Sequence, residues 1–197
     1  MRISNKICLI VIDIDGTLLD SNNRISPGAE EMIQKALDRG IFVSLCSGRG
    51  NPMIKPFVRR LGLRHPYIIS GGAAIMAADG VEVIEQHRFS HDQMQKVKAI
   101  GRQAGCGILA HTTDVLYAEF SDPIWDRIST WDWVSGESDP LMQRVADIST
   151  VFEQPIIRMD FFALPPELDR AYTAAQQTGL HAIRLNHNVE VSTPGAD

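Results

Sequence analysis

The strongest constraint on the fold is an unbroken apolar run that ends in two carboxylates. Residues 7–12 are all apolar, and Asp13, Ile14, Asp15 and Gly16 follow them directly. A run without polar alternation is typical of a parallel strand that is covered on both faces. In open α/β sheets, ligands bind at the carboxyl ends of such strands. Because like charges at close range raise each other's energetic cost, the two acids indicate a functional site rather than a folding requirement.

The first part of the chain alternates between strand and helix patterns. Ser26 is a favourable N-cap for a helix that Gly40 ends. A second apolar strand is predicted over 41–45, a helix over 52–61 and a third strand over 66–69. This order with short connections predicts a parallel sheet with right-handed crossovers.

A second polar motif ends the neighbouring strand. Ser47, Gly48 and Arg49 follow the second apolar run, so we expect them beside Asp13 and Asp15. A hydroxyl and the N–H groups of a glycine loop before a helix form an anion site, and the planar fork of an arginine can clamp phosphate. Taken alone, the motif leaves an alternative open, in which Ser47 caps the next helix and Arg49 is solvated.

These motifs resemble those of a known family. The run from Asp13 to Asp20, Asp-Ile-Asp-Gly-Thr-Leu-Leu-Asp, closely resembles the first signature of the haloacid dehalogenase-like phosphohydrolases, and Ser47-Gly-Arg resembles the second. The resemblance implies that Asp13 is a nucleophile that takes up a phosphoryl group and that Asp15 is the general acid and base. It also implies a Mg²⁺ ion held by Asp13 and by the backbone carbonyl of Asp15. The implied phosphate or substrate contacts come from Gly16, Thr17, Ser47, Gly48, Arg49 and Gly72.

The chemistry suits these residue types independently of the family. A carboxylate that attacks phosphorus divides one difficult displacement into two easier ones. A hard divalent cation offsets the repulsion between carboxylate and phosphate. Side chains two positions apart on a strand share a side, as Asp13 and Asp15 would. The alternative for this pair is a calcium-type turn or a solvated loop.

The resemblance also implies a domain plan. Residues 70–73, Ser-Gly-Gly-Ala, stand where the Cof-like, type IIB sugar-phosphatase branch has Asn-Gly-Ala, and that branch carries a large inserted cap. We therefore expect an α/β fold with an incomplete Rossmann-like parallel core sheet and an inserted α+β cap domain. The expected boundaries are 1–85 for the core, 86–188 for the cap and 189–197 for the start of the return to the core.

The expected cap mixes helices and strands. A capping box at 90–93 predicts a helix over 91–104, and strands are predicted over 107–111, 115–120 and 155–163, with a final hairpin over 181–192. The stretch 122–147 is predicted to be helical with interruptions. It holds Trp125, Trp131 and Trp133, for which both a substrate-lining and a core role stay open. The histidines show no metal-ligand spacing, but His111 and Asp114, at a turn between cap strands, are candidates for contact with substrate.

The chain ends before two further signatures of the family. In relatives, a run like that at 189–195 leads to a lysine, a helix and a Gly-Asp-x-x-Asn-Asp loop. Lys55 and Lys96 are the lysines considered as replacements, although nothing in their context favours either. We therefore expect a C-terminally truncated relative whose first strand is an open apolar edge, which a homodimer would cover.

Net charge and composition further limit the classes of function that we expect. The net charge is −5, which gives no reason to expect nucleic acid, and no apolar run approaches a membrane span. Without a signal-peptide pattern or a disulfide framework, we expect a cytoplasmic protein. The predicted function is a Mg²⁺-dependent phosphatase of small phosphate monoesters, similar to sugar phosphates, that acts through an aspartyl-phosphate and is impaired in this chain. The alternative is a catalytically inactive fragment or a module that binds a phosphorylated ligand.

Overall fold

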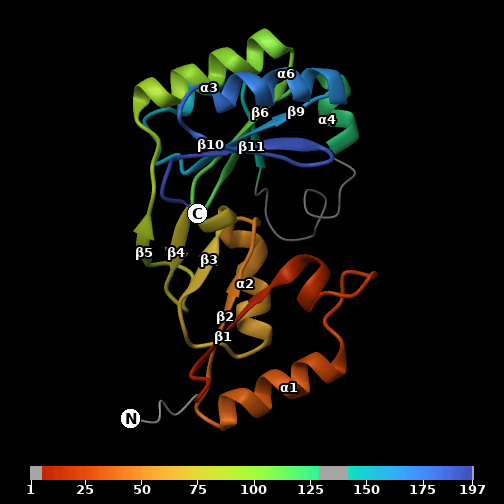
Figure 1. Cartoon of the computed structure of the whole chain (residues 1–197), viewed down its shortest axis with the longest axis vertical. Helices are drawn as coiled ribbons and strands as arrows, with labels where there is room; N and C mark the ends of the chain where they lie inside the picture. Colours follow the sequence, from red (N-terminus) through yellow and green to blue (C-terminus); the bar gives the residue numbers. More distant parts are fainter. Residues whose placement is uncertain (1–5, 129–141, 197) are drawn as a thin grey trace. The chain divides into compact units, whose positions relative to one another are not determined.

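The computed structural model describes residues 6–128 and 142–196, and the chain divides into two compact units between Glu85 and Gln86 (Figure 1). Each unit combines helices with one sheet. The expected α/β class, with a parallel sheet in one part and an α+β second part, is confirmed. None of the described helices combines the length and the apolarity that crossing a bilayer requires.

The first unit begins with a parallel sheet. Its elements are β1 (Leu9–Asp13), a turn of π-helix (Ile14–Leu18), α1 (Pro27–Asp38), β2 (Phe42–Cys46), α2 (Asn51–Arg60), β3 (Tyr67–Ile69), a 3-10 turn (Ser70–Gly72), β4 (Ala74–Met76) and β5 (Val83–Gln86). The strand order is β1-β2-β3-β4-β5. β1, β2 and β3 run parallel, and β4 runs antiparallel to β3. The predicted alternation of strand and helix is therefore confirmed.

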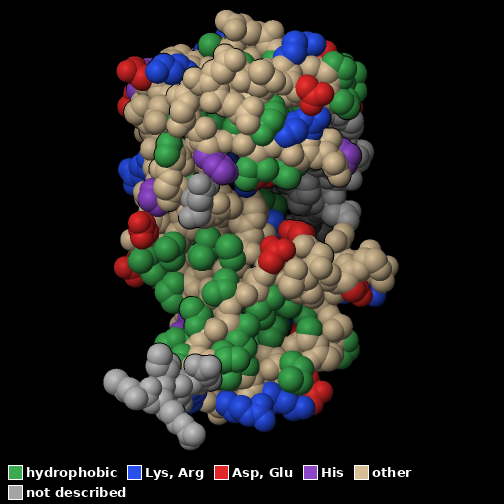
Figure 2. Space-filling model, in the orientation of Figure 1, with side chains coloured by type: hydrophobic (Ala, Val, Ile, Leu, Met, Phe, Trp, Pro, Cys, Tyr) green, Lys and Arg blue, Asp and Glu red, His purple; other side chains and the backbone are tan. Residues whose placement is uncertain are grey.

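β1 lies at the edge of the described sheet, which differs from the prediction of a strand covered on both faces. Leu9 is 53% exposed and Val11 is 49% exposed, and Phe42 on the adjacent β2 is 53% exposed. Figure 2 shows hydrophobic side chains gathered over the part of the first unit that holds β1 and β2. The open apolar edge expected for the first strand is thus present in the described sheet, whereas the covering of both faces that the apolar run indicates is not, because such a run specifies that a strand can be covered, and not which segment covers it.

The second unit is a mostly antiparallel sheet with helices on one face. Its elements are α3 (His91–Ala104), β6 (Gly107–His111), β7 (Leu116–Glu119), α4 (Asp122–Ile128), β8 (Met142–Arg144), a 3-10 turn (Ile148–Val151), β9 (Arg158–Phe162), α6 (Pro165–Gln176), β10 (His181–Arg184) and β11 (Asn188–Ser192). The strand order is β10-β11-β9-β6-β7-β8. α3 and α6 lie side by side across the sheet (Figure 1). The core between them joins side chains of α3 and α6 to alternate residues of the strands, including Val97, Leu168, Ile108, Met159 and Val191.

The structure of this unit differs from two of our expectations. The stretch 122–147, predicted to be helical, contains α4 but also β8, which pairs parallel to β7. Trp131 and Trp133 lie outside the described residues. Residues 189–192, expected to begin the return to the core, form most of β11, which is hydrogen-bonded to both β9 and β10. The return itself stays a prediction.

Candidate active site

Three parallel strands end at one edge of the first sheet. Asp13 at the end of β1 is in register with Cys46 on β2, and Cys46 is in register with Ile68 on β3. The segments that follow these strands therefore start at the same edge. They are the π-helical turn after β1, the Ser47–Gly50 loop after β2 and the 3-10 turn after β3.

Asp13 and Asp15 lie on either side of the buried residue Ile14. Ile14 is fully buried, whereas Asp13 and Asp15 on either side of it are exposed. Gly16 has a φ of +76°, a left-handed conformation that residues with a Cβ resist, and it turns the chain away from the strand. Thr17 then reaches back, and its Oγ1 donates to Asp13 Oδ2 at 3.5 Å. Burial of Ile14 thus fixes both acids on the accessible side of the turn.

Arg49 is held by Asp15. Its Nε donates to Asp15 Oδ2 at 2.9 Å and its Nη2 donates to Asp15 Oδ1 at 2.6 Å, which is the bidentate geometry that matches a guanidinium to a carboxylate. The guanidinium carbon also lies 5.7 Å from the centre of the Phe57 ring. The solvated alternative for Arg49 is therefore wrong, and its role as a phosphate clamp stays a prediction.

The loops after β2 and β3 are tied together through their backbones. The N–H of Gly71 donates to the carbonyl of Ser47 at 3.0 Å, and the N–H of Ser70 donates to the carbonyl of Arg49 at 2.8 Å. Ser47 is buried, and its Oγ accepts the N–H of Arg49 at 3.2 Å. Gly50, not Ser47, occupies the N-cap of α2, so the structure does not support the capping alternative for Ser47. Gly72 completes the 3-10 turn with a φ of +98°.

Comparison with known proteins gives the family. A family model for haloacid dehalogenase-like hydrolases matches residues 10–169, which is most of the chain. The chain belongs to the haloacid dehalogenase-like hydrolases. The family expected from the sequence is thereby confirmed.

Individual relatives of the family are longer than this chain. The pyridoxal phosphate phosphatase YbhA of Escherichia coli is 29% identical over 155 residues, which are 74% of this chain and 54% of that protein. A solved haloacid dehalogenase-like hydrolase from Bacteroides thetaiotaomicron has a TM-score of 0.82 at 20% identity, covering 98% of this chain and 73% of the other. A solved subclass IIB sugar phosphatase has a TM-score of 0.74 at 18% identity, covering 95% and 70%. The chain spans about half the length of the curated relative.

The donors at this edge of the sheet are oxygen atoms, which are the ligands that a hard cation prefers. Two carboxylates and a backbone carbonyl are oxygen donors, and Mg²⁺ is commonly bound by one or two carboxylates together with substrate phosphate and water. Within the described ranges, His, Cys, Asp and Glu side chains do not gather in a group of three that could hold a metal. Asp13 and Asp15 therefore fit a shared, incomplete magnesium shell rather than a closed cage.

Charge at this edge reaches the neighbouring strand. Burial raises the pKa of the Cys46 thiol, and the Asp13 carboxylate adds to that rise. The Asp13 carboxylate thus influences the pKa of Cys46, the residue in register with it on β2. Of the lysines considered as replacements, Lys55 is engaged by a backbone carbonyl of the first unit and Lys96 belongs to the second unit. Lys55 donates to the carbonyl of Gly80 at 3.0 Å and so supports a turn, and Lys96 is exposed on α3 of the second unit.

In the second unit, His111 belongs to a buried charged cluster that the sequence did not reveal. His111 ends β6 and pairs with Asp160 on β9, and Arg158 and Glu190 complete the group. The signal that could have found it is Arg158-Met-Asp160, because two charges at alternate positions of a buried strand need partners. Asp114, the other candidate, lies in the turn that follows β6 and accepts from the Thr113 hydroxyl.

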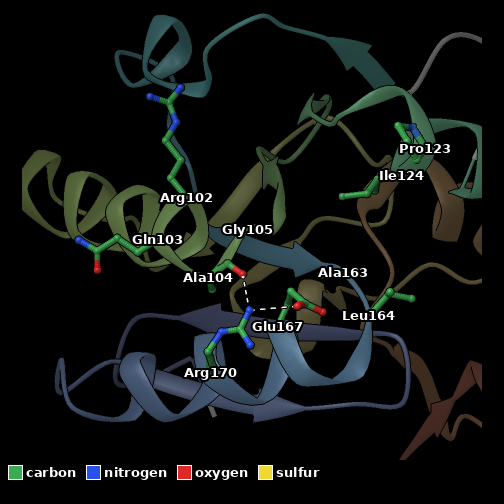
Figure 3. Close-up of a pocket in the computed structure, with 10 residues that line it drawn as sticks. All are labelled: Arg102, Gln103, Ala104, Gly105, Pro123, Ile124, Ala163, Leu164, Glu167 and Arg170. Carbon is green, nitrogen blue, oxygen red and sulfur yellow. Dashed lines mark hydrogen bonds and ion pairs between the residues drawn. The ribbon is translucent and has the colours of Figure 1, made fainter.

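The second unit also has a surface hollow of about 670 Å³, shown in Figure 3. It lies where the end of α3 meets the start of α6 and of α4. Arg170 donates to the carbonyl of Ala104 at 3.3 Å and pairs with Glu167 at 3.0 Å, while Arg102 points away from Arg170. None of the residues predicted for the site line this hollow. Because the charge of Arg170 is balanced by Glu167, it gives no reason to place an anion there.

Proposed function

We propose that the first unit carries the phosphoryl-transfer centre of a phosphatase for small phosphate monoesters. The observation that carries the proposal is the placement of Asp13 and Asp15 at the end of β1, beside the tethered Ser47–Arg49 loop at the end of β2. Carboxylates and anion-binding donors at one sheet edge supply a nucleophile and a place for the phosphate it attacks.

The residues would divide the reaction as follows. A carboxylate oxygen of Asp13 forms a bond to phosphorus as the bond to the leaving oxygen breaks, and Asp15 protonates that oxygen. Asp15 then takes a proton from water, whose oxygen attacks the aspartyl-phosphate and releases phosphate and free Asp13. Ser47 and the N–H groups around Gly48 would bind the phosphate oxygens.

Two further groups bear on this chemistry. The Asp13 carboxylate and the Asp15 carbonyl would hold a Mg²⁺ ion, which when bound offsets the charge of the phosphate. Arg49 must exchange Asp15 for phosphate, or share its five donors between them, before Asp15 can transfer a proton. Gly16, Thr17 and Gly72 would shape the surrounding turns.

For the substrate, we propose a small phosphorylated metabolite of the sugar-phosphate type. Support comes from relatives, since one is named a pyridoxal phosphate phosphatase and a protein of the same fold is a sugar phosphatase. A cytoplasmic location and the lack of a nucleic-acid partner stay predictions that rest on charge and composition.

The test is Mg²⁺-dependent release of phosphate from p-nitrophenyl phosphate. We expect turnover by the chain, loss of turnover in Asp13→Asn, and no change beyond about twofold in Asp38→Asn, which alters an exposed acid at the end of α1. Absence of turnover in folded protein would contradict the proposal. It would favour the alternative, a module that binds a phosphorylated ligand without cleaving it.

A further inference from the structure

The Ser47–Gly50 loop is tied to the turn after β3, but its far end depends on how α2 begins. Gly50 is the N-cap of α2 and has no side chain with which to accept from the first helical turn. Pro52, next to the start of the helix, has no N–H to donate. The N–H of Met53 donates to the Gly50 carbonyl at 3.0 Å and closes the first turn. What fixes this turn against the rest of the unit must therefore come from side chains of α2.

Asn51, the first residue of α2, binds through both ends of its amide. Asn51 is 2% exposed. Its Oδ1 accepts from the hydroxyl of Tyr67, which is fully buried on β3, and its Nδ2 donates to the carbonyl of Gly80 at 3.2 Å. Movement of this amide would leave buried polar groups without partners, which is costly. Asn51 thus joins the start of α2 to β3 and to the turn between β4 and β5.

A second side chain of α2 reaches the same carbonyl. Lys55 lies four residues after Asn51, on the same face of the helix, and its Nζ donates to the Gly80 carbonyl at 3.0 Å. A carbonyl oxygen has two lone pairs and can accept from both side chains. Because the two donors come from successive turns of α2, they fix the direction of the helix as well as the position of its first residue.

The turn that offers this carbonyl is closed by its own hydrogen bonds. The N–H of Gly80 donates to the Ala77 carbonyl at 2.9 Å, and the N–H of Ala77 donates to the Glu82 carbonyl at 2.9 Å. Asp79 Oδ1 accepts two backbone N–H groups of the turn, at 2.8 and 3.1 Å. Gly80 has a φ of +66°, and a Cβ there would lie 2.8 Å from the Tyr67 hydroxyl oxygen. The turn is therefore an ordered support that approaches α2 closely because Gly80 has no side chain.

We propose that Asn51, supported by Lys55, is a positioning residue that holds the Ser47–Gly50 loop in the conformation that binds phosphate. Asn51 is buried and acts through Gly50, the residue before it, at which the loop ends. Without these hydrogen bonds the loop opens in part of the molecules, and the apparent affinity for phosphate falls with the fraction in which it is closed. The inference rests on the proposed function for the identity of the ligand.

Amide hydrogen exchange in the full chain observes the loop without a ligand. The N–H groups of Met53 and Gly71 report on it, because they donate to the carbonyls of Gly50 and Ser47. In Asn51→Ala we expect both groups to exchange at least about tenfold faster than in the wild-type chain, since opening no longer has to break the two hydrogen bonds of the amide.

Ser44→Ala is the matched control. It also removes a buried hydrogen bond of the first sheet, from Ser44 Oγ to the Pro66 carbonyl at 2.6 Å, but this bond does not involve α2. The two exchange rates should stay as in the wild-type chain. Equal acceleration in Ser44→Ala and Asn51→Ala, or none in Asn51→Ala, would overturn the inference. If Asn51→Ala does not fold, Lys55→Met decides: it keeps an apolar stem, removes one donor and should accelerate both groups by about threefold, whereas unchanged rates would overturn the inference.

Binding measures the consequence for the proposed site. In Asn51→Ala we expect the affinity for inorganic phosphate to fall at least about threefold, and KM for p-nitrophenyl phosphate to rise in proportion, with kcat changed by less than about twofold, because bound substrate selects the closed loop. Ser44→Ala should change neither constant. A fall in kcat with KM unchanged would overturn the positioning role. If the folded wild-type chain binds no phosphate, the proposed function fails, and the exchange rates still decide whether Asn51 holds the loop.

Discussion

Arg49 and Asp15 form a two-point ion pair across 34 residues of sequence, joining the loop after β2 to the turn after β1. Both residues are expected to act on the same substrate, yet in the structure the Arg49 guanidinium donates its hydrogen bonds to the Asp15 carboxylate. A phosphate that binds Arg49 therefore competes with Asp15, and its arrival would free the carboxylate for proton transfer. Under the proposed function, binding of phosphate and activation of the acid would be coupled through this one contact.

Replacing Arg49 tests that coupling. In Arg49→Gln we expect about tenfold weaker binding of inorganic phosphate, since a charge-assisted contact contributes roughly 1.5 kcal/mol or more. The free energy of unfolding should change by less than about 1 kcal/mol, because the Asp15 side chain is half exposed and such pairs are screened. Calorimetric titration and urea unfolding measure the two quantities. Arg60→Gln removes another exposed pair, with Glu30, and should not alter phosphate affinity. Equal affinities in both variants would refute the coupling.

Backbone strain next to the site gives a second prediction. Ser70 has a φ of +52°, which costs a residue with a Cβ about 1–2 kcal/mol, and its buried Oγ has no hydrogen-bond partner in the described chain. Ser70→Gly should raise the free energy of unfolding by up to about 1 kcal/mol. Gly71→Ala, at a φ of +67°, should lower it by a similar amount. Urea unfolding of the two variants checks this, and a loss of stability in Ser70→Gly would contradict it.

The exposed edge of β1 gives a third prediction, that the chain forms a homodimer. Leu9 and Val11 present an apolar strand whose outer backbone groups can pair with a second copy. We expect light scattering after size exclusion at low micromolar concentration to show a dimer, and Val11→Lys to give a monomer. Ile84→Lys, at an exposed apolar residue of β5, should remain dimeric. A well-folded wild-type monomer would contradict the prediction.

Helix caps and strand ends could be predicted from the sequence, whereas contacts between distant segments could not. The capping box of α3, in which Ser90 Oγ accepts from Gln93 N–H and Ser90 N–H donates to Gln93 Oε1, follows from neighbouring residues alone. The positions of Asp13 and Ser47 at strand ends follow from the apolar runs before them. The Arg49–Asp15 pair and the His111 cluster depend on strand register and on side-chain direction between distant segments. Nothing in a local pattern fixes these.

A close approach between α3 and the sheet gives a fourth prediction. A Cβ on Gly101 would lie 2.8 Å from Phe161 and 3.0 Å from Ile108, so the helix packs where it does only because Gly101 has no side chain. Gly101→Ala should therefore destabilise the protein by about 1–3 kcal/mol through overpacking, although alanine is the better helix former. Gly28→Ala in α1 meets no atom within 4 Å and should be neutral or slightly stabilising. Thermal unfolding of both variants measures the difference. Similar melting temperatures would contradict the packing argument.

The buried His111 makes stability depend on pH. Because burial lowers the pKa of His111 below its ordinary 6.5, the unfolded chain takes up a proton more readily than the folded chain as the pH falls below 6.5. Stability therefore falls as the pH falls through this window, by up to about 1.4 kcal/mol per unit. Glu190 acts in the opposite sense, because burial raises its pKa above 4.5. Asp160 contributes only at lower pH. Burial opposes its ionisation, but Arg158 and His111 outweigh that and bring its pKa to about 2.

Urea unfolding at pH 7.0 and pH 5.0 measures this dependence. From pH 6.5 to 5.0 the buried histidine can lower the free energy of unfolding by at most about 2 kcal/mol. In His111→Gln that part of the loss should disappear, because glutamine does not titrate, and the opposite effect of Glu190 should then show. His91→Gln, at an exposed position, should keep the loss seen in the wild-type chain. If His111→Gln lost as much stability as the wild-type chain, His111 would not be the buried neutral group that the cluster requires.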